Sequence, residues 1–197
     1  MHNKYNPQAS VTFKSNGSRE VSVPYDSSTL PGVVSNDVFN IGDLIIKDQA
    51  FVAVQDFPLA YALAPYVFNF FKSHYSQIKQ SRFDGVFGLA LNDTNSVPSP
   101  FYNMITQNVI ASPVFSYHIS PSSQAGTFSN YVTFGGVDPT AYVGDLSYVP
   151  TTGKGRWEVG LSNISLGDNE LVLESGTIVT IDTGASWVLL KKNHLGL

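Results

Sequence analysis

A carboxylate, a hydroxyl and a glycine stand in a row near the end of the sequence, directly after an apolar segment. They are Asp182, Thr183 and Gly184, in the segment VTIDTGASWVLL that runs from Val179 to Leu190. An unpaired charge at the end of a hydrophobic strand is costly, so this carboxylate needs either a polar turn around it or a chemical task. If Asp182 takes part in general acid–base chemistry, a partner group must be found elsewhere.

Other catalytic chemistries find no matching pattern. The sequence has no Cys, no G-x-S-x-G segment and no phosphate-binding Walker loop, which excludes thiol chemistry and disfavours a serine hydrolase or a P-loop enzyme. The four histidines are far apart and show no metal-ligand spacing: His2, His74, His118 and His194. The sequence therefore predicts neither a metal site nor a cofactor.

The composition narrows the range of partners and locations. The 197 residues are 43% hydrophobic and only 13% charged, with a formal net charge of −4. Such a chain is not expected to bind nucleic acid, and no apolar run approaches the length of a membrane span. The polar start lacks an apolar h-region, so no signal peptide is expected in this chain. Three N-glycosylation sequons suit a secreted chain, although chance explains them equally well: Asn16, Asn92 and Asn163.

Most of the sequence has the pattern of short strands broken by turn residues. The following segments alternate polar and apolar residues or are rich in β-branched and aromatic residues: 19–25, 33–54, 115–120, 130–136 and 155–167. Gly42-Asp43 marks a hairpin turn within the second of them. Apolar residues at helical spacing predict a helix over 66–80, and Ser99 with Pro100 predicts the start of another over 99–110. The predicted fold class is all-β, mainly strands with short helices.

With its apolar lead-in and the Ala-Ser that follows, the Asp-Thr-Gly segment resembles the active-site loop of the pepsin-like aspartic proteases, peptidase family A1. Three further segments occur in the order of that family. VSVPYDSSTLPG (21–32) stands where the family has its flap, and RFDGVFGLA (82–90) is similar to its supporting Asp-Gly segment. Residues 131–159 resemble the passage that closes the N-terminal lobe and enters the C-terminal lobe. The resemblance covers nearly the whole chain.

The resemblance implies a role for each residue of the Asp-Thr-Gly loop. Asp182 would be catalytic, and Thr183 would brace the site with its hydroxyl. Gly184 would let the backbone approach the carboxylate, and the loop would continue through Ala185 and Ser186. Many members carry Thr or Ser at position 185. Ala185 lacks this hydroxyl, whose hydrogen bond would lower the pKa of the catalytic carboxyl. The complete enzyme is therefore expected to work nearer neutral pH.

Two other segments receive supporting roles from the resemblance. Tyr25 and Asp26 would lie at the tip of the flap, a hairpin that closes over the peptide and excludes water. Asp84 and Gly85 would form the supporting loop, and we expect them to be buried near the junction of the two lobes.

The implied fold is the bilobal pepsin-like fold, of which this chain holds an incomplete, middle part. We expect residues 1–145 to form the N-terminal lobe without its first strands, and residues 146–197 to begin the C-terminal lobe. Motif order makes Asp182 the second aspartate of the family, and no other Asp-Thr-Gly or Asp-Ser-Gly occurs in the sequence. The first aspartate is therefore expected before Met1, and the chain alone is expected to be inactive.

The resemblance implies an aspartic-type endopeptidase that acts on polypeptide substrates. Two aspartates that share one proton would activate a water for attack on the peptide carbonyl, without a metal or cofactor. A secreted, vacuolar or lysosomal location is implied as well. Two alternatives stay open. One is a non-catalytic binding or inhibitor-type relative on the same fold, and the other is a homodimer in which each chain supplies one aspartate.

Overall fold

The structure is a computed structural model, and it describes residues 3–25, 28–54, 84–91, 97–120, 130–153, 155–185 and 188–189. Contacts divide the chain into two compact units. One consists of Met1–Leu89 and Asp93–Asp138, and the other of Ala90–Asn92 and Pro139–Leu197. The lobe boundary expected after residue 145 stays a prediction, because contact groups within part of a protein do not define its lobes.

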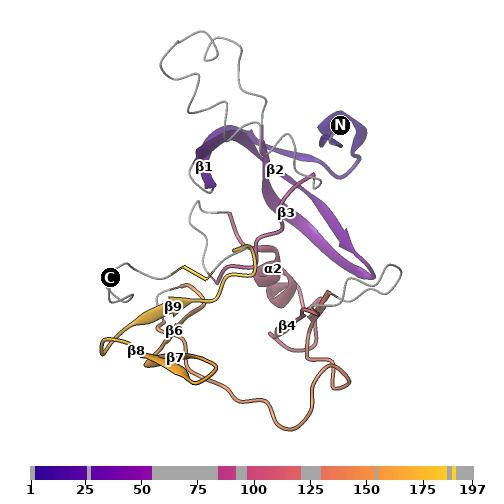
Figure 1. Cartoon of the computed structure of the whole chain (residues 1–197). Helices are drawn as coiled ribbons and strands as arrows, with labels where there is room; N and C mark the ends of the chain where they lie inside the picture. Colours follow the sequence, from indigo (N-terminus) through magenta and orange to yellow (C-terminus); the bar gives the residue numbers. More distant parts are fainter. Residues whose placement is uncertain are drawn as a thin grey trace, which may run out of the picture. The chain divides into compact units, whose positions relative to one another are not determined.

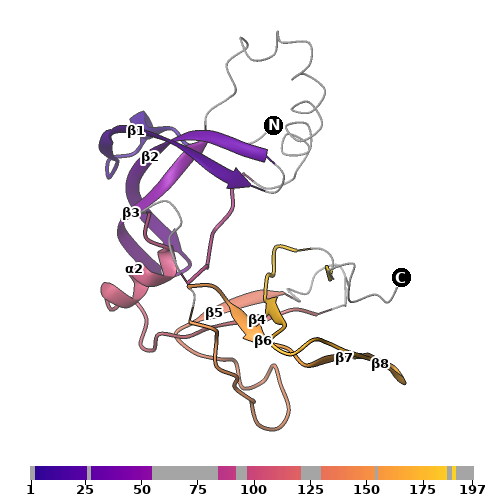
Figure 2. The ribbon, with the colours of Figure 1, turned by 90° about the vertical axis from the view of Figure 1, so that its left-hand side faces the viewer.

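A three-stranded antiparallel sheet is the main element of the first unit (Figure 1). Its strands lie in chain order: β1 (Lys14–Tyr25), β2 (Ser28–Ile41) and β3 (Leu44–Val54). They curve along their length (Figure 2), as long twisted strands do. The two-residue turn Gly42-Asp43 joins β2 to β3, and Gly42 has a φ of 56°, which glycine adopts without strain.

One short helix, α2 (Pro100–Thr106), packs against β3 of this sheet. The side chain of Ser99 caps the helix by accepting a hydrogen bond from the backbone N–H of Tyr102. The buried helix residues Phe101 and Met104 form a hydrophobic core with Ile46 of β3. Burial of these side chains, rather than helix propensity, stabilises so short a helix.

Two glutamines add polar bonds between α2 and β3. Gln107 pairs with the backbone of Lys47: its Nε2 donates to the carbonyl oxygen (2.7 Å) and its Oε1 accepts from the N–H (2.9 Å). The buried Gln49 accepts a hydrogen bond from Nδ2 of Asn103 (2.9 Å) and donates to two backbone carbonyl oxygens. Within the described part of the chain, no buried side-chain nitrogen or oxygen lacks a hydrogen-bond partner.

Three smaller elements complete the described first unit. The 3-10 helix η1 (Pro7–Ala9) precedes β1. β4 (Phe115–His118) and β5 (Tyr131–Phe134) form an antiparallel pair. The ring of Phe115 meets that of Phe101 edge-on, with 4.7 Å between the ring centres, so this pair adds to the core around α2.

The second unit contains four short strands in two antiparallel pairs. The strands are β6 (Glu158–Gly160), β7 (Asn163–Leu166), β8 (Asn169–Val172) and β9 (Ile178–Thr180). β6 pairs with β9, and β7 pairs with β8. The β7–β8 hairpin turns through Gly167-Asp168, the same dipeptide that joins β2 to β3, and Gly167 has a φ of 61°.

The predicted fold class is confirmed, because the described part of the chain is mainly strands with one short α-helix. Each of the five predicted strand segments contains an observed strand. The helix predicted over 99–110 is confirmed but ends at Thr106, since Asn108 adopts a left-handed φ of 54°. The helix predicted over 66–80 lies outside the described residues. None of the helices in the described ranges is long and apolar enough to cross a membrane.

Candidate active site

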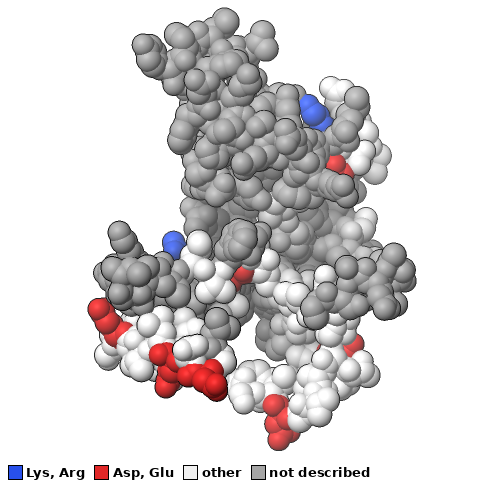
Figure 3. Space-filling model, in the orientation of Figure 1, with Lys and Arg blue, Asp and Glu red and all other residues white. Residues whose placement is uncertain are grey.

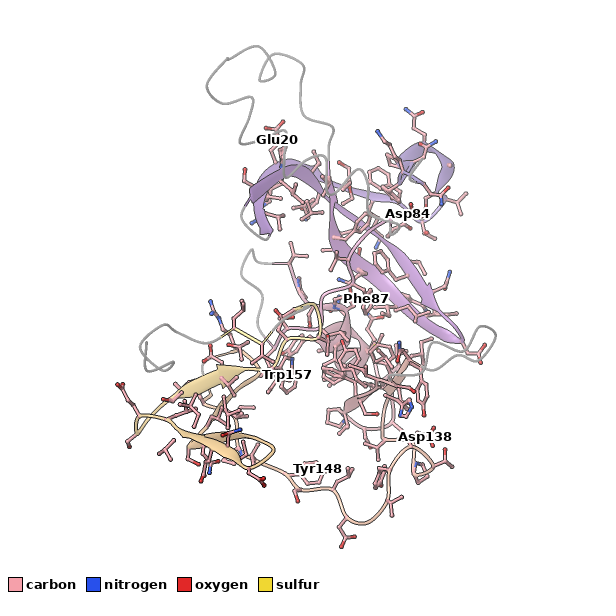
Figure 4. All side chains as sticks on the ribbon, viewed as in Figure 1. Glu20, Asp84, Phe87, Asp138, Tyr148 and Trp157 are labelled. Carbon is pink, nitrogen blue, oxygen red and sulfur yellow. The ribbon has the colours of Figure 1, made fainter. Side chains whose placement is uncertain are left out.

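Asp182 is the first residue after an extended strand ladder in the second unit. β9 pairs antiparallel with β6, with Thr180 opposite Glu158. One more backbone bond, from Ile181 N to the carbonyl oxygen of Trp157 (2.8 Å), carries the ladder beyond the end of β9; Trp157 is labelled in Figure 4. The backbone that leads into Asp182 is therefore fixed by hydrogen bonds up to the preceding residue.

The Asp-Thr-Gly sequence forms a tight turn around its own carboxylate. Oδ1 of Asp182 accepts a 2.8 Å hydrogen bond from the backbone N–H of Gly184, the pattern of an Asx turn. A Cβ at position 184 would lie only 3.2 Å from the same oxygen, so a larger residue there would press on the carboxylate. The N–H of Ala185 also donates to the backbone oxygen of Asp182, at 3.3 Å. The turn thus supplies a donor that stabilises the carboxylate.

All described residues of this loop are exposed: Asp182, Thr183, Gly184 and Ala185. Ser186 lies outside the described residues. An exposed carboxylate held by one backbone donor can exchange a proton with water or with a bound substrate. No group of three or more His, Asp or Glu side chains that could hold a metal ion occurs among the residues with a described placement.

The segment with the predicted flap is a β-hairpin. Tyr25 is the last residue of β1 and pairs with Ser28 at the start of β2, so its backbone lies in this hairpin. Its side chain and the whole of Asp26 lie outside the described part of the structure. The role of both residues over a substrate stays a prediction.

Gly32 supports this hairpin in a way that sequence reasoning missed. It lies in β2, where it pairs with Val21 of β1 and with Val54 of β3. A Cβ at this position would lie 2.4 Å from Cγ1 of Val52 and 2.8 Å from the backbone oxygen of Ala53. A glycine inside an apolar strand is the signal that could have revealed this close approach.

Asp84 and Gly85, the predicted supporting loop, are exposed, so the expectation that they are buried is wrong. The carboxylate of Asp84, which is labelled in Figure 4, makes a two-point contact with Asn3 before β1. The backbone N–H of Asn3 donates to Oδ1 and its Nδ2 donates to Oδ2, both at 2.8 Å. The carboxylate is therefore stabilised at the surface by hydrogen bonds from a segment 81 residues away.

The structure also contains a buried acidic residue that sequence reasoning missed. Asp37 lies in the middle of β2 and is only 6% exposed. Its carboxylate accepts hydrogen bonds from the side chains of Tyr5 and Thr12 and from the backbone N–H of Val38. The pairing of β2 with β3 shifts register between Asp37 and Phe39. The signal in the sequence is a single carboxylate inside the apolar strand VVSNDVFNI.

These contacts set the protonation of both partners. Burial raises the pKa of the Asp37 carboxyl, but hydrogen bonds from the hydroxyls of Thr12, Tyr5 and Ser10 and from the backbone N–H of Val38 outweigh it and hold the pKa well below its usual range. Burial, the hydrogen bond to Asp37 and the negative charge of Asp37 raise the pKa of Tyr5 to about 12. Asp37 is therefore a buried anion that ties the segment before β1 to the sheet.

The fold and the Asp-Thr-Gly turn match one family of proteins. A family model described as eukaryotic aspartyl protease matches residues 1–196, and the chain belongs to this family. It is 37% identical to vacuolar protease A of Aspergillus fumigatus over 193 residues, 96% of this chain and 44% of that protein. It is 36% identical to cathepsin D of Dictyostelium discoideum over 170 residues, 84% of this chain and 39% of that protein. The family expected from the sequence motifs is thereby confirmed.

Similarity extends to vacuolar aspartic protease of Candida albicans, at 34% identity over 193 residues, 96% of this chain and 42% of that protein. The chain thus spans less than half the length of these curated relatives. Several of the relatives are named as vacuolar proteases.

Proposed function

We propose that this chain belongs to an aspartic-type endopeptidase of the pepsin class and supplies Asp182 as one of its two catalytic carboxylates. The observation that carries the proposal is the turn at Asp182, where the N–H of Gly184 holds Oδ1 at the exposed end of a strand ladder. Membership of the aspartyl protease family supports the same reaction class. No second Asp-Thr-Gly occurs in the 197 residues, so the partner carboxylate comes from another part of the full protein.

The geometry around Asp182 suits one half of a two-carboxylate site. Two close carboxylates cannot both ionise, so the pair holds one proton. The ionised member takes a proton from a water that attacks the peptide carbonyl, and the protonated member donates to that carbonyl oxygen. The N–H of Gly184 fixes Oδ1 of Asp182 and leaves Oδ2 to face the water. Thr183 braces the two active-site loops, and Ala185 and Ser186 continue this one.

The other predicted residues have supporting tasks in this proposal. Tyr25 and Asp26 form the tip of a flap that closes over the bound polypeptide and excludes water; support comes from the β1–β2 hairpin that ends at Tyr25. Asp84 and Gly85 support the active-site loop that carries the first aspartate of the family. Asn3 is the hydrogen-bond partner of Asp84. A vacuolar location is proposed on the names of the relatives, and a lysosomal location is the alternative that the family resemblance implies.

The test is proteolysis by the full-length protein that contains this chain, on an unfolded protein substrate from acid to neutral pH. Asp182→Asn should reduce the rate by about 10²–10⁴-fold, because it removes a general acid–base group. Asp145→Asn is the matched control, since it removes an exposed carboxylate from the same unit and should leave the rate unchanged. A statine-type transition-state mimic should block the wild type.

Two results would redirect the proposal. Binding of polypeptide without cleavage, unchanged by Asp182→Asn, would favour the non-catalytic relative. Statine-sensitive cleavage by the 197-residue chain alone, abolished by Asp182→Asn, would favour the homodimer. We expect neither result, because the proposal places the second carboxylate in another part of the same full-length protein, where the two carboxylates share one proton.

A further inference from the structure

The β7–β8 hairpin of the second unit carries a sequon whose acceptor and hydroxyl residue lie on the same exposed face. Asn163 is the first residue of β7, and the sequon continues through Ile164 to Ser165. Asn163 and Ser165 are exposed, whereas Ile164 between them is half-buried. Strand residues two apart point to the same side of a sheet, so an enzyme can reach the Asn amide and the Ser hydroxyl together.

The residues opposite this sequon on β8 are exposed too. Val172 pairs with Asn163 and Glu170 pairs with Ser165; Val172 is 75% exposed. Acidic side chains lie over this part of the second unit in the space-filling view (Figure 3). A sugar chain on Asn163 would displace no packed side chain and would cover the apolar surface of Val172, which otherwise faces water.

The side chain of Asn163 is held in a way that is compatible with modification. Its Nδ2 donates a hydrogen bond to Oε1 of Glu170. An amide nitrogen carries two hydrogens, and an N-glycosidic bond replaces only one of them. The remaining N–H can keep the bond to Glu170, which would orient the first sugar along the face of the hairpin.

We propose that Asn163 is an N-glycosylation site; the proposal rests on the vacuolar or lysosomal location proposed above, which requires passage through the secretory pathway. Nδ2 attacks the anomeric carbon of an oligosaccharide linked to a lipid pyrophosphate. A carbon–nitrogen bond forms, and the carbon–oxygen bond to the pyrophosphate breaks with its electron pair on the leaving lipid pyrophosphate. The Nδ2 proton passes to a base of the transferase, and nothing is oxidised or reduced.

Of the three sequons, only this one has both of its polar side chains described. At Asn16 the acceptor is exposed, but the side chain of Ser18 lies outside the described part, and Asn92 lies outside it entirely. The structure therefore assigns an accessible acceptor face to Asn163 alone.

The test is peptide mapping of the full-length protein, secreted from yeast with an Asn-Ser-Thr tag at its C-terminus. Glycan on the tag identifies the molecules that have passed the transferase, and only these are analysed. Release of the glycan with an amidase in heavy-oxygen water should convert Asn163 to labelled aspartate. Asn163→Gln and Ser165→Ala should abolish the label, and Ser165→Thr should keep it.

Asn169→Gln is the matched control, because Asn169 is an exposed asparagine of the same hairpin without a sequon; the label at Asn163 should persist in it. An unmodified Asn163 peptide in wild-type molecules with a glycosylated tag would overturn the proposal. This measurement is made on the wild-type protein, so it does not depend on whether any variant folds. Because the measurement is a mass shift and not proteolysis, its failure would leave the proposed protease activity untouched.

Discussion

The hydroxyl of Tyr5 donates a 2.7 Å hydrogen bond to the buried carboxylate of Asp37, 32 residues further along the chain. Thr12 donates to the other oxygen of the same carboxylate. Asp37 thereby holds both ends of the segment before β1 against the middle of β2, the strand that runs from the proposed flap. We expect the strength of this network to affect the stability of the whole β1–β2 hairpin.

Tyr5→Phe removes one donor from the buried carboxylate and should lower the free energy of unfolding by about 1.5–3 kcal/mol, as expected for a hydrogen bond to a charged group. Denaturant unfolding of the full-length protein followed by far-ultraviolet circular dichroism, which reports on the strands, measures the change. Tyr102→Phe is the control, because Tyr102 is 57% exposed, and it should change stability by less than about 0.5 kcal/mol. Equal effects of the two substitutions would contradict the role of the Tyr5 hydroxyl.

The stabilisation by the Asp37 network should remain complete down to mildly acidic pH. The pKa of Asp37 is lower in the folded state than its ordinary value of 3.8, so its contribution to stability is complete above that value and is lost as the pH falls through the folded pKa. The stability difference between wild type and Asp37→Asn should be constant from neutral pH to about pH 5 and should shrink below about pH 4. A difference that shrinks already between neutral pH and pH 5 would show that this pKa is not lowered.

Gly32→Ala should destabilise the hairpin, because the added methyl would meet Cγ1 of Val52 at 2.4 Å and the backbone oxygen of Ala53 at 2.8 Å. The expected cost is about 1–3 kcal/mol, typical of overpacking. Adding Val52→Ala should restore only part of it, since the backbone contact persists. Gly136→Ala is the control, as no atom lies within 4 Å of its added Cβ. Full recovery in the double variant would show that the backbone can move aside.

Gly184→Ala tests the turn at Asp182 in the full-length protein. Its methyl would lie 3.2 Å from Oδ1 and should push the carboxylate aside, and a misplacement of this kind costs up to about 10²-fold in rate. We expect a lower kcat with little change in KM, measured with a peptide substrate. Gly160→Ala in β6 has open space around its added Cβ and should behave as wild type. An unchanged kcat in Gly184→Ala would remove the proposed role of the turn.

The strands, the turns and the Asp-Thr-Gly loop follow from local rules, and the sequence predicts them well. Alternating residues indicate the strands, Gly42-Asp43 indicates a turn, and Ser99 with Pro100 indicates the start of a helix. Asp182 stands at the end of a strand because an apolar segment leads into an Asx turn closed by Gly184. Each of these features depends on interactions between residues close together in the chain.

The acidic residues show what only the tertiary structure decided. The family resemblance predicts that Asp84 is buried, yet its side chain is exposed and hydrogen-bonded to Asn3, 81 residues away. The sequence patterns do not single out Asp37, yet it is a buried anion. Burial and charge compensation of a carboxylate depend on which distant segment supplies its donors, and no local pattern contains that information. For this protein the sequence determined the strands and the Asp-Thr-Gly turn, and the tertiary contacts decided the environment of each carboxylate.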